Sequence, residues 1–392
     1  MPDPRDSPPL PRASQPGVSW SDLTDSLTWP RLLAAPRLAR RPANIVLGML
    51  AVVCIIAADR LPALWNPSGG GALSAYALLA AEHLRALAAG VLKLDAHAAA
   101  DALGQLFFKI PGGLIKAAPF STAFTFAFGI IGVSLFTGAI CRGVALIIGG
   151  ERPRSPLTML RFAATRWLSL AAAPLVPIML FYAAALATMS VGWVGLSLSG
   201  VQVIGGAAFF VELLLALFAV LMVICIFIGG PLLLPAVACE GTDAIDAGQR
   251  VLSYAWGRPD RLLVYLLILI ARGVISVGLF ILVAKLTSLI ALAAATLWLP
   301  EGIAADIRQG FASDPLSGWS RRATVSLVHF WVNVPMVIAA GYAMSYVCAS
   351  GTLAYLAMRR LVDGQDMGEV WIEPAAPATR ADDAGGEEGG NE

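Results

Sequence analysis

The feature that most constrains this chain is a series of predominantly apolar stretches. Several of them reach the length that crosses a bilayer, about 20 residues, and residues 168–191 carry no charge at all. In hydrocarbon every backbone N–H and C=O group needs a partner within the chain, so such stretches fold as helices. Only 14% of the residues are charged and the mean hydropathy is +0.74, whereas soluble domains have about 25% charged residues. We therefore predict an all-α, polytopic transmembrane helical bundle with interfacial amphipathic helices.

Six membrane spans account for these stretches. Together they form a predicted transmembrane domain over residues 19–362, preceded by a Pro-rich segment, residues 1–18, that we expect to be disordered. Residues 363–392 carry nine acidic side chains and only Arg380, a composition that cannot bury enough surface to fold, so a disordered acidic tail is predicted. The spans cover residues 43–58, 119–141, 168–191, 207–230, 262–285 and 328–357.

The distribution of Arg and Lys predicts the orientation of these spans. Fourteen of them flank the spans on the side of the two termini, whereas the longer loops of the other side carry eight. Cytoplasmic loops carry the excess of positive charge, so both termini are expected in the cytoplasm. Helical spans with this bias predict an integral protein of a bacterial cytoplasmic membrane.

The loop over residues 60–118 is too long for a simple turn. Residues 72–92 are nearly apolar enough for a seventh span, but Glu82 and Arg85 at their centre would each cost several kcal/mol in hydrocarbon. We predict instead two external interfacial helices, over residues 73–92 and 96–109, with Asp95 capping the second.

A basic segment precedes the first span, and two interpretations fit it. Residues 19–42 combine apolar residues at helical spacing with Arg31, Arg37, Arg40 and Arg41. The segment could lie as an amphipathic stretch on anionic headgroups, or it could be the positively charged flank that stops a span.

A polar segment, EGTDAIDAGQRVLSYAWGRPDR over residues 240–261, separates the fourth and fifth spans. Glycines and prolines in residues 229–235 break the preceding helix. Thr242 or Asp243 can cap a new amphipathic helix, which Gly257 ends. We predict a cytoplasmic amphipathic elbow.

The polar side of the elbow carries its candidate site residues. Asp246 and Arg250 are four positions apart and should form an ion pair on one helix face. The predicted elbow residues are Glu240, Asp246, Arg250 and Arg258.

The same residues carry a resemblance to known proteins. The pattern is similar to uncharacterised bacterial six-helix membrane protein families, related loosely to the membrane domain found with some glycerophosphodiester phosphodiesterases. The resemblance implies architecture only, because these families bring no agreed activity and no catalytic residue. The matching residues are Glu240, Asp246, Ala247, Arg250, Tyr254, Arg258 and Pro259.

Charged and polar residues inside the spans are the strongest candidates for a functional role. Arg272 lies about 16 Å along the fifth span from Arg261, near the middle of a bilayer, and Lys285 follows thirteen residues later. Intramembrane charges are costly and point to function unless a structural ion pair explains them. Candidate partners of Arg272 are Glu212, which we expect near the external interface, and Asn333 or His329 on the sixth span.

Searches for catalytic and binding motifs find none. There is no phosphate-binding loop, no HExxH and no metal-ligand spacing among the three His. The five Cys are scattered and are expected to be small buried hydrophobes. We therefore predict a protein without enzymatic activity, cofactor, metal or nucleic-acid partner.

Two functions fit these observations. The first is a non-enzymatic accessory, scaffold or lipid-associated membrane protein whose partners are membrane lipids and other membrane proteins. The alternative is a small-solute or lipid transporter that uses the intramembrane Arg272.

Overall fold

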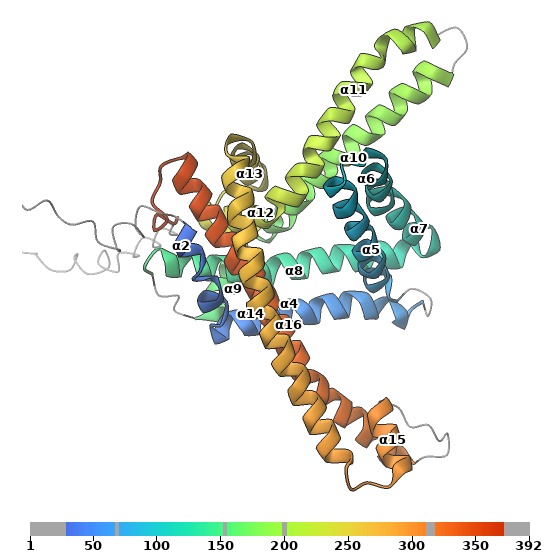
Figure 1. Cartoon of the computed structure of the whole chain (residues 1–392), viewed down its shortest axis with the longest axis vertical. Coiled ribbons are helices and arrows are strands. Elements are labelled where there is room, and N and C mark those ends of the chain that lie inside the picture. Colours follow the sequence, from blue (N-terminus) through green and yellow to red (C-terminus); the bar gives the residue numbers. More distant parts are fainter. Residues whose placement is uncertain (1–28, 67–69, 152–154, 198–201, 311–317, 372–392) are drawn as a thin grey trace, which may run out of the picture.

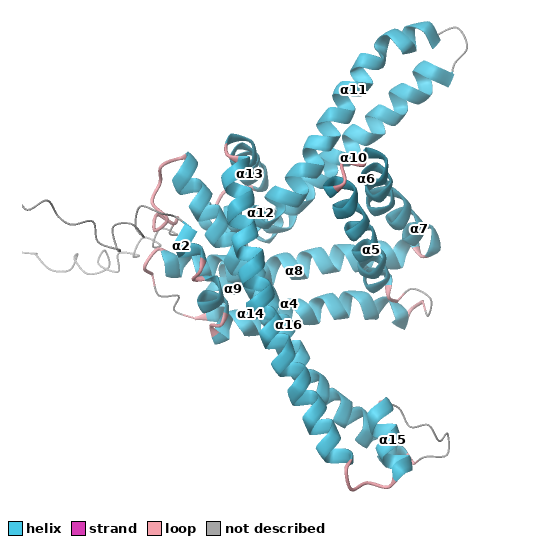
Figure 2. Ribbon diagram, viewed as in Figure 1, coloured by secondary structure: helices cyan, strands magenta, loops and turns pink. Residues whose placement is uncertain are grey.

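The computed structural model describes residues 29–66, 70–151, 155–197, 202–310 and 318–371 (Figure 1). Throughout these residues the regular structure is helical, with no strand (Figure 2), which confirms the all-α prediction. The predicted disorder of residues 1–18 and of residues 372–392 lies outside the described residues.

Seven described helices are long and apolar enough to cross a membrane, and the chain is an integral membrane protein. Five of them contain a predicted span in full. The fourth predicted span, 207–230, covers most of α11 and continues through a π-helical turn (Cys225–Gly229) to the start of α12 (Gly230–Glu240). The seventh, α5, was expected to lie outside the bilayer. The seven are α4 (Pro42–Arg60), α5 (Ala72–Leu92), α8 (Pro119–Ile148), α10 (Trp167–Ser197), α11 (Gln202–Ile224), α14 (Pro259–Thr296) and α16 (Trp319–Val362).

At one end of the molecule the helices converge in a buried region that we call the hub (Figure 1). It consists of α9 (Pro156–Thr165), α12 (Gly230–Glu240), α13 (Ala244–Gly257) and the adjoining ends of α8, α10, α14 and α16. The last part of α16 is buried almost continuously, including Tyr355 and Arg359. The ends of several long helices therefore meet in a common packed core.

Away from the hub the spans diverge as three helical hairpins, which we call arms (Figure 1). The first arm is α4 with α8, the second α10 with α11, and the third α14 with α16. Large apolar side chains are exposed along the arms, for example Phe210 at 66% and Leu279 at 61%. Such surfaces suit contact with lipid tails, which are as apolar as the side chains.

The predicted external loop is helical and packs between the first and second arms. It forms α5, α6 (Ala96–Gly104), a π-helical turn (Gln105–Lys109) and α7 (Ile110–Ala117), which we call the wedge. Tyr76 packs edge-on against Phe126 of α8, and Phe107 lies 4.7 Å from the ring of Phe181 of α10. The wedge thus contacts both arms.

Two aspartates cap the helices of the wedge. Asp95 accepts a hydrogen bond from the Ala98 N–H at 3.0 Å, which confirms its predicted role. Asp59, at the end of α4, accepts from the backbone N–H of Leu73 at 2.8 Å. The carboxylate of one helix therefore satisfies the exposed N–H groups at the start of the next.

The basic segment before the first span packs on the protein itself where it is described. It contains the short helices α2 (Trp29–Leu32) and α3 (Ala35–Ala39). Leu32, Leu38 and the alanines of α3 are buried, whereas Trp29 is 42% exposed. Ser345 of α16 donates a hydrogen bond to the Ala39 carbonyl at 2.9 Å. The apolar side of this part therefore faces protein, whereas Arg37 and Arg41 remain exposed.

The crossing of α4 and α16 depends on two glycines. A Cβ atom at Gly48 would lie only 2.1 Å from the Gly341 carbonyl oxygen. Small residues allow such close helix approach inside membranes. Gly341 and Ser345 are four residues apart on α16, so both lie on the face of this helix that packs closely.

We expect Gly48→Ala to lower the free energy of unfolding by about 1–3 kcal/mol, because backbone must move to admit the methyl group. Gly278→Ala is the matched control, since a Cβ at Gly278 meets no atom within 4 Å. Thermal unfolding in detergent measures both. Equal stability of the two variants would contradict the proposed close crossing.

Candidate functional site

The C-terminus of α12 is held by donors from three other parts of the chain. Arg142 of α8 donates to the Ala238 carbonyl at 3.1 Å, and the Trp371 N–H donates to the Cys239 carbonyl at 3.0 Å. Arg166, between α9 and α10, donates to the Gly241 carbonyl. The last carbonyls of a helix lack partners within it and carry partial negative charge, so cations stabilise this end.

Glu240, the last residue of α12, is the centre of an ion-pair network. Its Oε1 accepts from Arg359 Nη1 at 2.7 Å and from the Tyr355 hydroxyl at 3.0 Å. Its Oε2 lies 3.6 Å from Arg250 Nη1. Arg359 is only 2% exposed. The Glu240 carboxylate therefore compensates a buried positive charge.

The first nine residues of the predicted acidic tail lie in the described part of the chain and contact the hub. Residues 363–371 form a strap held by Arg359 Nη2, which donates to the Asp366 carbonyl at 2.9 Å and also to that of Glu369. Met367 is 2% exposed. Composition does not reveal the strap, because the Trp371 N–H bonds to Cys239, which is far away in sequence.

Aromatic and acidic side chains complete the attachment of the strap. The Trp371 ring lies 5.0 Å from the Arg166 guanidinium and 5.5 Å from that of Arg142, which places it in cation–π contact with both. The Tyr254 hydroxyl donates to Asp363. Burial, together with this hydrogen bond, raises the pKa of Tyr254.

The structure changes the predicted pairing of the elbow. α13 is a helix as expected, and Asp243 is at its N-cap, although its side chain makes no capping hydrogen bond. Arg250 pairs with Glu240 and not with Asp246, so the predicted helix-face pair is wrong. α13 packs back on the hub, which brings Arg250 to the buried carboxylate and leaves Asp246 and Arg258 exposed.

Glu240→Ala should lower the free energy of unfolding by about 3–5 kcal/mol, because it leaves a buried guanidinium without its carboxylate. Denaturant unfolding of the purified protein measures this change. Asp246→Ala, on the neighbouring helix, is the control and should shift stability by no more than about 0.5 kcal/mol. A small effect at Glu240 would show that the network does not stabilise the hub.

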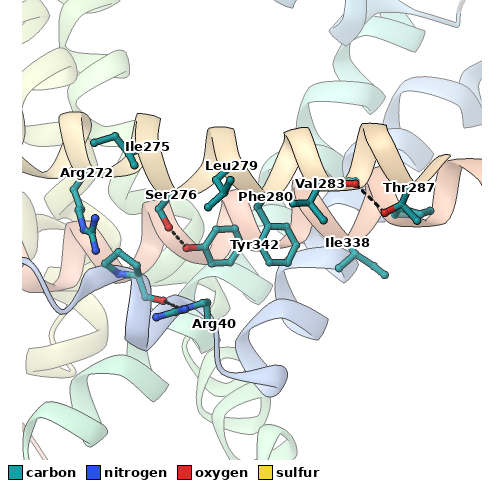
Figure 3. A pocket seen from close by; sticks show the side chains of 13 residues that line it. Arg40, Arg272, Ile275, Ser276, Leu279, Phe280, Val283, Thr287, Ile338 and Tyr342 are labelled. Carbon is teal, nitrogen blue, oxygen red and sulfur yellow. Dashed lines mark hydrogen bonds between the residues drawn. The ribbon is translucent and has the colours of Figure 1, made fainter. Parts of the chain in front are cut away.

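A second candidate site is an open, largely apolar groove along the third arm. It has a volume of about 490 Å³ and lies between α14, α16 and the end of α3. Its hub end carries two arginines, Arg40 and Arg272, and its floor carries Phe280, Ile338 and Tyr342 (Figure 3). Positive charge at one end of an apolar trough is the arrangement that an amphipathic anion requires.

Among the described residues, no carboxylate pairs with either arginine of the groove. Arg40 is exposed and its Nε donates to the Pro36 carbonyl at 3.2 Å. Arg272 is also exposed, and within the described residues no hydrogen bond or ion pair reaches it. Figure 3 shows Arg272 directed from α14 toward the helix that bears Pro36 and Arg40.

Beyond the arginines the groove follows the helix into the apolar part of the arm. The Ser276 and Tyr342 hydroxyls hydrogen bond to each other across α14 and α16. The lining continues to Thr287, about 22 Å along the helix from Arg272. One leaflet of hydrocarbon is about 15 Å thick, so the groove is long enough for a lipid chain.

The structure places Arg272 beside the start of the first span. It lines the same groove as Arg40, which lies two residues before α4 begins. Its expected position near the middle of the bilayer stays a prediction.

The predicted partners of Arg272 are not gathered around it. Asn333 Nδ2 donates to the His329 carbonyl at 2.7 Å within α16, and the His329 ring bonds to the Ile307 carbonyl at 2.6 Å. Glu212 is on the second arm, only 8% exposed, and lies three residues from the start of the candidate span Phe209–Glu240; its interfacial placement stays a prediction. Lys285 is exposed on the third arm.

Several residues of these sites had no functional role in the sequence interpretation. Arg142 and Arg359 were counted only as topological charges. Tyr342 and Trp371 gave no signal of their own. Arg40 was considered as part of a basic segment on anionic headgroups, but not as a residue of a groove.

Comparisons of the chain with protein-family models, with curated proteins and with solved structures found no match. The resemblance to six-helix membrane families therefore stays a prediction. Function has to be argued from the hub and the groove.

Proposed function

We propose that this integral membrane protein is a non-enzymatic, lipid-associated protein that holds an anionic phospholipid in the groove of the third arm. The phosphate would bind between Arg40 and Arg272, and one acyl chain would lie along α14 and α16. The observation that carries the proposal is the pair of exposed arginines at the end of an apolar groove.

The chemistry of the groove favours a lipid over a dissolved solute. Arg is well suited to phosphate because its planar fork donates two parallel hydrogen bonds. The groove is open along the arm, and exposed apolar residues such as Leu279 and Val283 border it. A small-solute transporter would instead use Arg272 inside an enclosed polar path.

We also propose that the hub faces the cytoplasm of a bacterial cell. The described arginines on the terminal side of the chain, among them Arg142, Arg166, Arg250 and Arg359, belong to the hub. An excess of positive charge on one side is typical of cytoplasmic faces.

Replacement of the two arginines tests the lipid site. Arg40→Gln and Arg272→Gln should each weaken binding of phosphatidylglycerol by about fivefold, since each basic residue contributes about 1 kcal/mol, and the double variant by about thirtyfold. Native mass spectrometry of protein taken from vesicles of phosphatidylcholine with or without phosphatidylglycerol measures the bound lipid. Free phosphate added in competition distinguishes a lipid from an inorganic anion.

Two controls separate lipid binding from folding. Lys93→Gln, an exposed residue of the wedge, should leave the bound lipid unchanged. Leu279→Trp should exclude the acyl chain while both arginines remain. Undiminished phosphatidylglycerol binding in the double Arg variant would overturn the proposal, and so would displacement by phosphate alone.

Topology is tested by the accessibility of a new cysteine. We expect Arg380→Cys to react with an impermeant maleimide only after the cell membrane has been opened. Native cysteines interfere little, since Cys141, Cys225, Cys239 and Cys348 are buried and Cys54 is half-buried. Labelling of intact cells would reverse the proposed orientation.

A further inference from the structure

A pair of hydroxyl groups lies in the groove of the third arm, beside its arginines. Ser276 of α14 and Tyr342 of α16 hydrogen bond to each other (Figure 3). The Tyr342 ring is stacked on Phe280, with 4.5 Å between the ring centroids, and Tyr342 is fully buried. Ser276 is half-buried and lines the groove. The pair therefore presents a well-positioned polar group to an occupant of the groove.

One proton of this pair has no acceptor in the protein. Each hydroxyl carries one proton, and the hydrogen bond between them uses only one of the two. Within the described residues no other hydrogen bond involves either hydroxyl. Because Tyr342 is the buried member, the arrangement that serves an occupant has Tyr342 donating to Ser276 Oγ. The Ser276 proton is then directed into the groove.

A third hydroxyl that lines the groove is bonded differently. Thr287 donates to the Val283 carbonyl, one turn earlier in its own helix, at 2.8 Å. Such bonds are common for Ser and Thr within helices, and they leave no proton for a ligand. Ser276 lacks this bond to its own helix, so of the two α14 hydroxyls in the groove it is the available donor.

The side chains along α14 follow the order of the groups in a glycerophospholipid. Arg272 is at the hub end of the groove, and Ser276 follows about 6 Å further along the helix. The apolar Leu279, Phe280 and Val283 come next. In a glycerophospholipid, a glycerol unit separates the phosphate from the acyl esters, and the hydrocarbon chains follow the esters. A phosphate bound by the arginines therefore brings an ester carbonyl to the level of Ser276.

We propose that Ser276 donates a hydrogen bond to an acyl ester carbonyl of the bound lipid, with Tyr342 as its positioning residue. The groove then selects ester-linked over ether-linked phospholipids. This inference rests on the proposed lipid site and specifies the class of lipid that the site takes. An ether-linked chain has no carbonyl, so it leaves the Ser276 proton without an acceptor in an apolar surrounding, which is unfavourable.

Competition between two lipids tests the inference on the wild-type protein, without any variant. Vesicles of phosphatidylcholine contain equal amounts of diacyl and dialkyl phosphatidylglycerol of the same chain length. The two differ in mass, so native mass spectrometry counts each of them on the protein. We expect about fivefold preference for the diacyl lipid, which is the effect of one neutral hydrogen bond.

Variants of the groove identify the donor. Ser276→Ala should lose the preference for the diacyl lipid, while it still prefers phosphatidylglycerol to phosphatidylcholine because both arginines remain. Tyr342→Phe should reduce the preference, since Ser276 is then free to bond to its own helix. Thr287→Val, on the same helix and in the same groove, is the matched control and should keep it, because the Thr287 hydroxyl is already bonded.

Infrared spectroscopy gives a readout that loss of packing alone would not produce. A hydrogen bond lowers the stretching frequency of an ester carbonyl, and this band is separate from the amide bands of the protein. Diacyl phosphatidylglycerol bound to the wild type or to Thr287→Val should show a lowered carbonyl band. The same lipid bound to Ser276→Ala should not show it.

The outcomes separate this inference from the lipid site on which it rests. Equal binding of diacyl and dialkyl phosphatidylglycerol by the wild type would overturn the ester inference and leave the lipid site standing. An undiminished diacyl preference in Ser276→Ala would also overturn it. A wild type that binds neither form of phosphatidylglycerol would overturn the lipid site and the ester inference together.

Discussion

The C-terminus of α12 is the point on which the rest of the structure depends. Its carbonyls accept hydrogen bonds from Arg142 and Arg166 and from the backbone of the strap, and its Glu240 holds Arg359. These donors come from three separate segments of the chain: α8, the junction of α9 and α10, and the end of α16 with the strap that follows it. A buried guanidinium without a partner costs several kcal/mol. Other packings of these segments that left a buried Arg unpaired would therefore be less stable.

The hub is tightly packed and the arms diverge because different groups surround their side chains. Polar groups in the hub find partners in one another, which fixes the packing of the helix ends. Along the arms, contact between apolar helices has little advantage over contact with lipid tails, so hairpins can diverge. Where a diverging arm meets the hub, an apolar groove adjoins basic residues, and this produces the candidate lipid site at Arg40 and Arg272.

Much of the fold could be predicted, but little of the candidate site. Apolar length identified the spans, and local capping identified Asp95 and the elbow helix. The spacing of residues along α13 could not predict that Arg250 pairs with Glu240 and not with Asp246. Such spacing describes only neighbours on the same helix. The neighbourhood of Arg272 and Arg40 was also beyond sequence reasoning, because the two residues lie on different helical segments and share only the groove.

The sequence by itself determined the class of protein, six of the seven helices that are long and apolar enough to cross a membrane, and the helical character of the loop between the first two spans. These depend on hydrogen bonding in hydrocarbon and on hydrophobic length, which are local properties of the chain. Tertiary structure alone decided which charges are buried, which are paired and which lie beside an open groove. Glu240 and Arg359 are 119 residues apart in sequence, and only the packing of several helices makes them a pair.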